Sequence, residues 1–267
     1  MVPESPGPLR VLDDLLRPPF DGDGPEAEAV LDVVPELAPS RGVEQSGYHH
    51  LDTLGHVFEV VRLTGLELEA GEIGARVPPE RHGALLFAAL LHDVAKPITR
   101  GEIGGRVLFV AHDTVGAHVA GEVALRLGVP ALYADLAFTL TALHLKIGFM
   151  ESERTDYPPE RLVPAAGAFG EELAVLSWAD RLAAQGPNLQ RKHLDRHRDL
   201  CTRFLAASRE AGPHSEPDYA GIREDLGPGA PEPEVGLVAA RARLYEVRGA
   251  RPKEALAAAA RTVRARS

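Results

Sequence analysis

The sequence predicts an all-α fold, a bundle of helices, and three observations support this. From about Asp52 onward, apolar residues recur at the three- and four-residue spacing of helices. Proline and glycine stand at the ends of most of these segments, where they favour helix starts and stops. Runs of alternating apolar and polar residues, which would indicate strands, are almost absent. With 267 residues, of which 45% are hydrophobic, the chain is long enough to bury a sizeable core.

The individual helices follow from their start and stop signals. Asp52 or Thr53 can cap the first clear helix, and a second is expected over residues 79–95, with Pro97 ending it. The glycine-containing segment 98–110 is expected to form a loop or a small β-hairpin. Later helices are expected over residues 113–128, 130–146, 169–184, 188–209, 233–247 and 252–264.

Proline and glycine also divide the chain into three parts. Residues 1–40 are rich in both and are expected to form a partly ordered lead-in with one or two short helices. Residues 41–210 are expected to form the main domain. Residues 211–267 are expected to form a helical extension that packs on this same domain.

Composition and charge exclude several classes of protein. The net charge of −10 disfavours binding to bulk double-stranded nucleic acid, although local cations can still hold a small phosphate ester. No stretch reaches the ~20 apolar residues of a membrane helix and no signal peptide is apparent, so no membrane association is expected. The single cysteine, Cys201, excludes an internal disulfide and fits a cytoplasmic location. Oligomeric state is not predicted by the sequence.

The pair His92-Asp93 directly follows an apolar run, residues 84–91, that is expected to enter the core. Buried polar groups are costly unless something pairs them, and a divalent metal binds imidazole and carboxylate together. The alternative is a histidine at a helix end beside a surface aspartate. These two residues alone do not decide between the two interpretations.

Four further side chains that can bind metals stand in apolar, helical segments of the chain. They are His56, His112, His144 and Asp180. Each alone is more often a hydrogen-bonded core or boundary residue than a ligand. Together with His92 and Asp93 they predict one metal centre, because metal sites in helical bundles are built from side chains on facing helices.

The order His56, His92-Asp93 and Asp180 resembles the HD-domain phosphohydrolase superfamily. Within it, the sequence is most similar to the HD domain of bacterial CCA-adding tRNA nucleotidyltransferases. The motifs that carry this resemblance are Tyr48-His49-His50-Leu51-Asp52, His92-Asp93-Val94-Ala95-Lys96-Pro97, Phe109-Val110-Ala111-His112-Asp113 and Trp178-Ala179-Asp180-Arg181-Leu182. The resemblance covers about residues 33–260, with its weakest match at Gly227-Pro228. Nothing in the sequence resembles a nucleotidyltransferase head, so only the phosphohydrolase activity is implied.

The resemblance implies an HD-domain helical bundle with a site for one or two divalent metal ions. One ion would be held by His56, His92, Asp93 and Asp180. As in relatives with two ions, Asp93 would bridge to a second ion held by His112 and His144. Nitrogen and oxygen ligands without thiolate suit Mn, Fe, Co, Ni or Zn, and Mg is also compatible.

Such a centre suits the hydrolysis of phosphate esters, because a bound ion activates water as a nucleophile and polarises a phosphoryl oxygen. Asp93 and Lys96 are the expected catalytic residues, and Lys96 can also neutralise substrate phosphate. The alternative for Lys96 is a solvated lysine that complements the helix end. Arg100, His49 and His50 are expected to contact the substrate.

The expected function is a metal-dependent phosphohydrolase that acts on nucleotide or RNA-terminal phosphate esters by attack of metal-bound hydroxide. The resemblance alone indicates 2′,3′-cyclic phosphodiesterase and/or phosphatase activity. A nucleotide phosphatase and a cyclic-dinucleotide phosphodiesterase are also compatible. The alternative from a different class is a non-catalytic module that binds nucleotides or RNA ends and partners a separate nucleotidyltransferase.

Several other polar residues carry weaker signals. Arg181 is expected to pair with a carboxylate near the site. His118 can orient a ligand, donate a proton or simply pack, and the sequence does not choose among these roles. His193 and His197 are expected on a solvated basic helix face, which could alternatively steer an RNA end. Cys201 is expected to be buried and unreactive.

Overall fold

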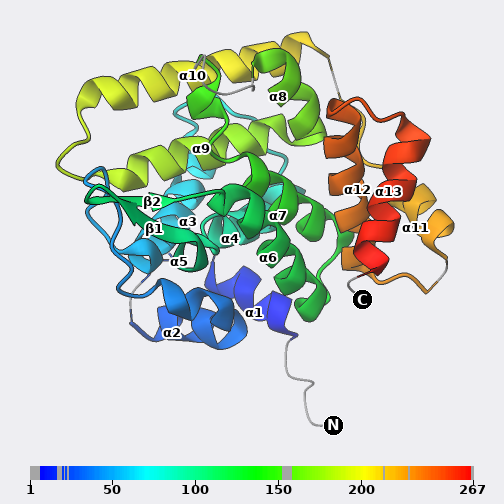
Figure 1. Cartoon of the computed structure of the whole chain (residues 1–267), viewed down its shortest axis with the longest axis horizontal. Helices are drawn as coiled ribbons and strands as arrows, with labels where there is room; N and C mark the ends of the chain where they lie inside the picture. Colours follow the sequence, from blue (N-terminus) through cyan, green and yellow to red (C-terminus); the bar gives the residue numbers. More distant parts are fainter. Residues whose placement is uncertain are drawn as a thin grey trace.

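The computed structural model describes residues 7–16, 20, 22, 24–151, 158–212, 214–227 and 229–265. Nearly all of the regular secondary structure of these residues is helical, which confirms the all-α prediction (Figure 1). The α-helices are α1 (Pro8–Leu15), α2 (Gly24–Val33), α3 (Thr53–Ala70), α4 (His82–Leu91), α5 (Lys96–Thr99), α6 (His112–Leu127), α7 (Ala131–Leu143), α8 (Pro159–Ala166), α9 (Gly170–Ala184), α10 (Arg191–Glu210), α11 (Tyr219–Leu226), α12 (Glu232–Val247) and α13 (Pro252–Arg264). Short 3-10 helices are η1 (Pro35–Ser40), η2 (Pro79–Arg81), η3 (Ile147–Phe149) and η4 (Gly167–Phe169). Pro228 of the weakest motif match, and residues 1–6, 17–19, 21 and 23 of the expected lead-in, lie outside the described residues.

Helix α4 lies at the centre of the bundle and is apolar on every side. Residues 84–91 of this helix are all buried, and α4 contacts α3, α6, α7 and α9. A helix that is hydrophobic all round must be surrounded by other elements. The end of α4 therefore delivers the next two residues, His92 and Asp93, to the interior of the protein.

The helix expected over residues 79–95 is shorter in the structure. Helix α4 ends at Leu91, residues 92–95 form a turn, and the one-turn helix α5 follows. Pro97 stands at the start of α5 and does not end the preceding helix. Proline is favoured in a first helical turn because the amides there have no acceptor within the helix.

The other helix starts show which caps the chain uses. The Asp52 carboxylate caps α3 as expected, accepting a hydrogen bond from the Gly55 amide at 2.8 Å. The helix expected from residue 188 begins later, at Arg191, after Gln190 as the capping residue. Asn188 instead lies in the preceding loop, where its backbone N–H donates to the Gly47 carbonyl at 2.9 Å.

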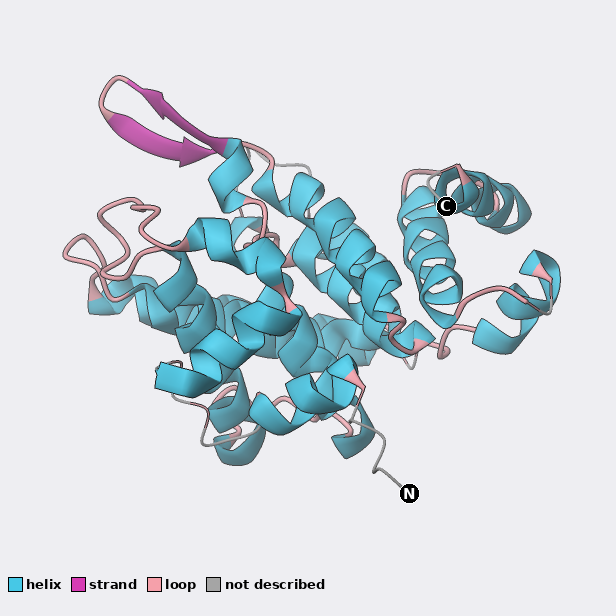
Figure 2. Cartoon of the chain, turned by 90° about the horizontal axis from the view of Figure 1, so that it is seen from below, coloured by secondary structure: helices cyan, strands magenta, loops and turns pink. Residues whose placement is uncertain are grey.

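Residues 98–110 contain an antiparallel hairpin, β1 (Arg100–Ile103) paired with β2 (Arg106–Phe109), which confirms the hairpin alternative. Gly104 and Gly105 form the turn, and both have positive φ, which a two-residue hairpin turn of the type I′ class requires. The register places Arg100 opposite Phe109. Figure 2 shows the hairpin projecting from the helical body.

Both ends of the described chain contribute to one hydrophobic core. Leu12 near the N-terminus and Val263 in α13 belong to the same cluster of buried side chains. Helix α12 packs on α7 so closely that a Cβ added at Gly236 would lie 2.0 Å from the Ala131 carbonyl oxygen. The exact division into lead-in, main domain and extension stays a prediction. None of the described helices is both long and apolar enough to cross a membrane.

Candidate metal centre

Five of the six predicted ligand residues lie in the first turns of helices or directly after helix ends, and the sixth, Asp180, lies inside α9. His56 lies in the first turn of α3, and His92 and Asp93 follow α4. The remaining three are His112 at the start of α6, His144 directly after α7, and Asp180 in α9. All except Asp180 are buried, and the Asp180 side chain keeps 21% of its surface exposed.

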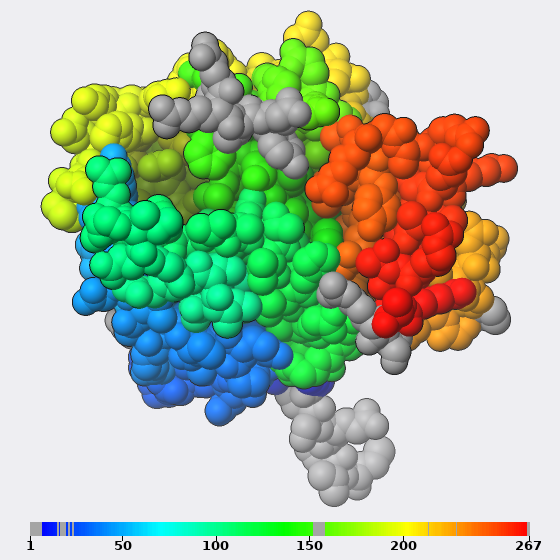
Figure 3. Space-filling view, viewed as in Figure 1, coloured from blue at the N-terminus to red at the C-terminus, as the bar shows by residue number. Residues whose placement is uncertain are grey.

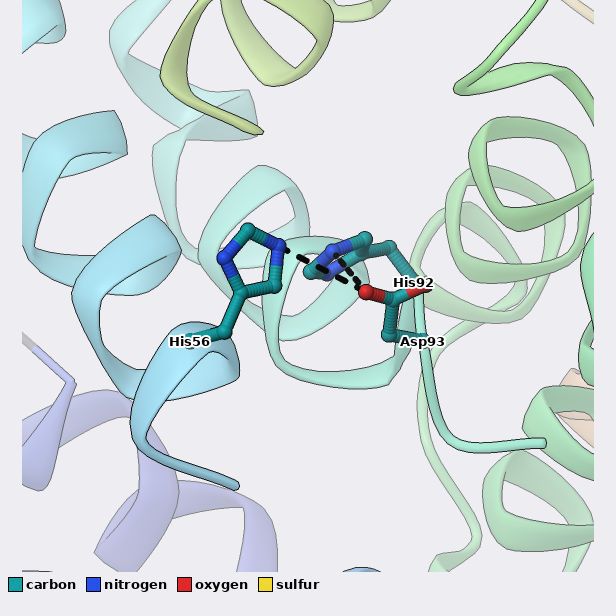
Figure 4. A group of neighbouring side chains, drawn as sticks. All are labelled: His56, His92 and Asp93. Atoms are coloured by element: carbon teal, nitrogen blue, oxygen red, sulfur yellow. Dashed lines mark ion pairs between the residues drawn. The ribbon is translucent and has the colours of Figure 1, made fainter. Parts of the chain in front are cut away.

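The two carboxylate oxygens of Asp93 face two different pairs of histidines. Oδ2 lies 3.1 Å from His92 Nε2 and 3.5 Å from His56 Nε2 (Figure 4). Oδ1 lies 3.5 Å from His112 Nε2 and 3.7 Å from His144 Nε2. The structure therefore contains two groups of potential ligands, one with His56 and His92 and one with His112 and His144, and both share Asp93.

Asp180 extends the first of these groups from the opposite side. Its Oδ1 lies 3.0 Å from His56 Nε2, across 124 residues of sequence. Burial alone would raise the pKa of Asp180, but the hydrogen bond with His56 holds it well below the ordinary value. Asp180 is therefore an ionised carboxylate beside the group formed by His56, His92 and Asp93.

Three of the histidines are oriented by backbone carbonyls three residues earlier in the chain. Nδ1 of His92 lies 2.7 Å from the Ala89 oxygen, and Nδ1 of His112 lies 2.7 Å from the Phe109 oxygen. Nδ1 of His144 lies 2.8 Å from the Thr141 oxygen. A neutral imidazole that donates through Nδ1 leaves the lone pair of Nε2 free, and such carbonyl bonds commonly orient metal-binding histidines.

The buried nitrogen atoms at the centre fit a metal ion. Nε2 of His92 and Nε2 of His112 are buried and have no hydrogen-bond partner among the described atoms. Buried polar atoms without partners are rare because their desolvation is not compensated. Nitrogen and carboxylate ligands of this kind suit a divalent transition metal. We conclude that the residues present fit the ion that the sequence predicts.

Burial and charge favour the metal-binding protonation state at His56, His144 and Asp93, whereas the Asp93 charge favours the protonated form of His92. Burial lowers the pKa of His56, and burial lowers the pKa of His144 to about 4. The pKa of His92 is raised, because the Asp93 carboxylate outweighs the opposing effect of burial. The pKa of Asp93 lies well below its ordinary value, because the charges of His92 and Lys96 outweigh burial. Neutral imidazole and ionised carboxylate are the forms that coordinate a metal.

Lys96 is buried beside Asp93, so the alternative of a solvated helix-end lysine is wrong. Its Nζ lies 2.5 Å from Asp93 Oδ2 and donates to Gln45 Oε1 at 2.6 Å. The same ammonium lies 5.4 Å from the centroid of the Phe109 ring. Gln45 was not predicted as a site residue, since nothing in the sequence links a loop glutamine to a lysine 51 positions later.

Two further contacts hold α6 and α7 in place at the centre. Lys146 Nζ donates to Asp113 Oδ2 at 2.6 Å, which joins the residues next to His112 and His144. Burial would raise the pKa of Asp113, but this bond to Lys146 outweighs it and lowers the pKa. A Cβ added at Gly116 would lie 3.0 Å from Thr141 Cγ2, so the glycine lets α6 lie close to α7.

The centre lies at the bottom of a cleft of about 910 Å³. One wall is the hairpin and the opposite side includes the loop residues 45–49, together with Arg181 and Asn188. Figure 3 shows a hollow in the surface between the hairpin and α10. Arg106 of the hairpin was not predicted as a site residue, because only the β1–β2 pairing brings it to the cleft.

The structure separates the predicted substrate-binding residues into two groups. His49 and Lys96 line the cleft, and the His49 ring lies 4.9 Å from the His56 ring. Burial, with the neighbouring His56 and Lys96, lowers the pKa of His49 to about 3. His50 and Arg100 are exposed and lie outside the described lining of the cleft. His50 instead lies 3.1 Å from the Ala184 oxygen through Nδ1.

Other polar residues have different surroundings from those expected. His197 is buried against Ser177, with Nε2 3.0 Å from its hydroxyl, so the prediction of a solvated position is wrong for this histidine. Arg181 lines the cleft, and no carboxylate among the described residues pairs with it, contrary to expectation. His118 packs on Phe138 and contacts Arg241 of α12 at 3.0 Å, away from the cleft. Its described contacts therefore favour a packing role.

Cys201 is buried as expected, and burial raises the pKa of its thiol to about 12. A thiol with so high a pKa carries little thiolate near neutral pH and is a poor nucleophile. The only cysteine of the chain therefore takes no part in the centre.

The fold and the centre together define a class of protein: a helical bundle that gathers histidines and aspartates from several helices around one centre. Residues 53–185 match the family model of the HD domain. The chain carries an HD domain and, through this segment, belongs to the HD-domain superfamily.

Curated relatives match the same region. The chain is 34% identical over 188 residues to the A-adding tRNA nucleotidyltransferase of Deinococcus radiodurans, covering 67% of this chain and 40% of that protein. It is 33% identical over 157 residues to the CC-adding tRNA nucleotidyltransferase of Thermus thermophilus, covering 57% of this chain and 32% of that protein. The chain thus spans less than half of the length of either relative.

Proposed function

We propose that this chain is a metal-dependent phosphohydrolase that acts on phosphate esters of nucleotides or RNA ends. The observation that carries this proposal is the position of Asp93, whose two oxygens face separate pairs of histidines. A carboxylate shared in this way is the arrangement of two-metal phosphoesterase sites.

The proposal assigns the ligands to two ions. His56, His92, Asp93 and Asp180 would hold one ion, and Asp93, His112 and His144 would hold the other. A divalent ion supplies Lewis-acid chemistry there, polarising a phosphoryl oxygen and lowering the pKa of water. The nitrogen and oxygen ligands suit Mn, Fe, Co, Ni or Zn, with Mg also allowed.

The chain's own side chains would bind and orient the phosphate. Lys96 lines the cleft with its Nζ 2.5 Å from Asp93 Oδ2, where it can offset the charge of an incoming phosphate. Gln45 holds the Lys96 ammonium in this position. Arg181 lines the same cleft and offers a planar guanidinium, which suits the oxygens of a phosphate group. His49 lies beside His56 and can donate a hydrogen bond to the ester.

The finer substrate is proposed from the relatives. Both curated relatives are named tRNA nucleotidyltransferases, which supports an RNA end or a nucleotide as the substrate. The resemblance to the HD domain of that family favours 2′,3′-cyclic phosphodiesterase and/or phosphatase activity. A cytoplasmic location is part of the same proposal.

A binding module that partners a separate nucleotidyltransferase is the second candidate. It is supported by the names of the two curated relatives, since both are tRNA nucleotidyltransferases. The complete set of six ligand residues and the buried Lys96 favour catalysis instead, because a module that only binds does not need them.

A panel of substrates and metals tests the proposal. The purified chain is incubated with 2′,3′-cyclic, 2′-, 3′- and 5′-nucleotides in the presence of Mn, Ni, Co, Mg or Zn, and released phosphate or opened ring is measured. We expect hydrolysis of at least one ester with a transition metal, and none with Asp93→Ala. Full activity of Asp93→Ala would exclude this mechanism. Tight nucleotide binding without hydrolysis under every metal would support the binding module.

A further inference from the structure

The exposed apolar side chains of this protein gather at one place. Among the described residues, the large hydrophobic side chains that remain exposed are Tyr48, Leu66, Ile98, Ile103, Leu108, Val110 and Phe149. Tyr48, Leu108 and Phe149 line the cleft, and Ile98, Ile103 and Val110 lie in or beside the hairpin. Only Leu66, on α3, belongs to neither group. Clustered exposed apolar surface in a folded protein commonly marks a binding site.

The charges of the cleft indicate what binds there. Among the residues that the structure describes, the acidic residues lining it are Asp93 and Asp180, both in the proposed metal centre. The other charged residues of this described lining are Lys96, Arg106 and Arg181, all basic, in a chain whose net charge is −10. An apolar wall beside local positive charge is complementary to a ligand with both a flat apolar part and an anionic part.

The hairpin presents both kinds of side chain over a short distance. Arg106, Val107, Leu108 and Phe109 of β2 all line the cleft. Phe109 connects this wall to the metal centre, because its carbonyl oxygen lies 2.7 Å from His112 Nδ1 and its ring lies 5.4 Å from Lys96 Nζ. A ligand group that contacts β2 at Leu108 would therefore lie near a phosphate bound at the centre.

Tyr48 supplies an aromatic ring among the loop residues that line the cleft. It is 43% exposed, and its ring lies 6.0 Å from the ring of His193 at the start of α10. The Tyr48 carbonyl accepts a hydrogen bond from the Gly186 amide at 2.8 Å, which fixes this loop against the end of α9. A fixed, exposed aromatic ring is a suitable stacking surface for a base.

We propose that Tyr48 and Leu108 form a subsite for the nucleobase of the substrate, with Arg106 and Arg181 beside it for phosphate. This inference rests on the proposed function for the identity of the reacting group. It adds a site that recognises the base of the nucleotide to a proposed function that concerns only its phosphate ester. The base can belong to a free mononucleotide or to the last residue of an RNA strand.

Binding of adenosine tests the subsite without any hydrolysis. Saturation-transfer NMR is measured with adenosine and with ribose on the wild type, Leu108→Ser and Tyr48→Ser. Leu66→Ser is the matched control, because Leu66 is 42% exposed and Leu108 38% exposed, but only Leu108 lines the cleft. We expect transfer to the base protons in the wild type and the control, and a loss of it in both cleft variants. No transfer to the base in the wild type would overturn the inference.

Kinetics with matched esters form the second test. The ratio of kcat/KM for adenosine 5′-monophosphate to that for ribose 5-phosphate is expected to fall about five-fold or more in Tyr48→Ser, since the aromatic ring that stacks on the base is removed. The ratio should also fall in Leu108→Ser, which loses an apolar contact to the base. Leu66→Ser should keep the wild-type ratio. An unchanged ratio in the cleft variants would contradict the base subsite without contradicting the proposed function. This result is expected if the hairpin instead docks a protein. Adenosine binding that depends on Leu108, in a chain that hydrolyses no ester, would support the base subsite and contradict the proposed function.

A short single-stranded RNA that ends in the same phosphate distinguishes the two sources of the base. Tighter binding of this RNA than of the mononucleotide would assign the subsite to an RNA end. Equal binding would assign it to free nucleotides. Either result supports base recognition, provided that it is weakened in Leu108→Ser and not in Leu66→Ser.

Discussion

Asp93 is a buried carboxylate surrounded by four imidazoles and the ammonium of Lys96. It is buried, its pKa is held well below the ordinary value, and each of its oxygens faces two imidazoles. Three of the four histidines around it are held through Nδ1 by backbone carbonyls three residues earlier, as for His92 and Ala89. Local backbone geometry thus orients these three rings, and packing of the helices brings all four rings together.

The shared carboxylate gives a prediction about metal stoichiometry. We expect two ions per wild-type chain, one in His144→Ala, and none in Asp93→Ala, because only Asp93 belongs to both ligand groups. Metal content is measured by mass spectrometry after dialysis. His118→Ala is the control and should keep both ions, since His118 contacts Phe138 and Arg241 away from the cleft. If Asp93→Ala and His144→Ala each kept one ion, Asp93 would not be a bridge.

At the scale of elements, helices α10 and α12 contain no ligand residue, but each packs on a helix that contains or precedes one. Helix α10 packs on α9, which contains Asp180, and His197 contributes a contact to both the hydroxyl and the carbonyl of Ser177. Helix α12 packs on α7, which ends next to His144. Neither contact involves a predicted ligand, yet both determine where the ligands lie.

The contact between α10 and α9 should make stability depend on pH. Burial lowers the pKa of His197 to about 4, whereas an unfolded histidine has a pKa of about 6.5. The depressed pKa means that this histidine's contribution is complete above pH 6.5 and is lost as the pH falls toward 4. Between pH 7 and pH 5 the loss is about 2 kcal/mol.

Denaturant unfolding at pH 7 and pH 5 measures this effect. The free energy of unfolding of His197→Gln should fall less between the two pH values than that of the wild type. His193→Gln, one turn earlier on the same helix and only half-buried, should behave like the wild type. Equal pH dependence in all three proteins would contradict the assignment to His197.

The contact between α12 and α7 should be sensitive to a single methyl group. In a helix interior, Gly to Ala is favourable by roughly 1 kcal/mol on propensity alone. At Gly236 the added Cβ would lie 2.0 Å from the Ala131 oxygen, so we expect Gly236→Ala to destabilise the protein by about 1–3 kcal/mol instead. Thermal unfolding measures this. Gly229→Ala, where an added Cβ meets nothing within 4 Å, should have little effect, and a stabilised Gly236→Ala would show that the helices separate easily.

At the scale of the whole molecule, the centre lies where the main parts of the bundle meet. Helices α3, α4, α6, α7 and α9 each supply ligand residues or the residues just beside them. The buried Nε2 atoms of His92 and His112 have no hydrogen-bond partner among the described atoms, so bound metal should stabilise the fold as a whole.

Removal of metal should therefore lower the melting temperature. Binding at a free ion concentration one hundred times the Kd contributes about 2.7 kcal/mol. For a chain of this size that corresponds to roughly 5–10 °C in Tm, which a thermal scan with and without chelator detects. Asp93→Ala should not respond to the chelator, whereas Asp195→Ala, at an exposed position of α10, should respond like the wild type. An unresponsive wild type would argue against a resident ion.

The sequence by itself determined the helical class, a loop or small hairpin over residues 98–110, and the set of candidate ligands. These depend on local features: the apolar run of α4, the glycine turn at Gly104-Gly105, and the placement of His92 and Asp93 directly after a buried helix. Such features act over a few residues, so they can be recognised without knowing what packs against them.

Only the tertiary structure decided which ligand residues form each group and which side chains surround them. It placed two histidine pairs on the two oxygens of Asp93, buried Lys96 against Gln45, and turned His197 toward Ser177. It also brought Leu108 to the cleft and left Arg100 outside its described lining. These outcomes depend on contacts between segments far apart in the chain, and helix periodicity does not specify which buried faces meet.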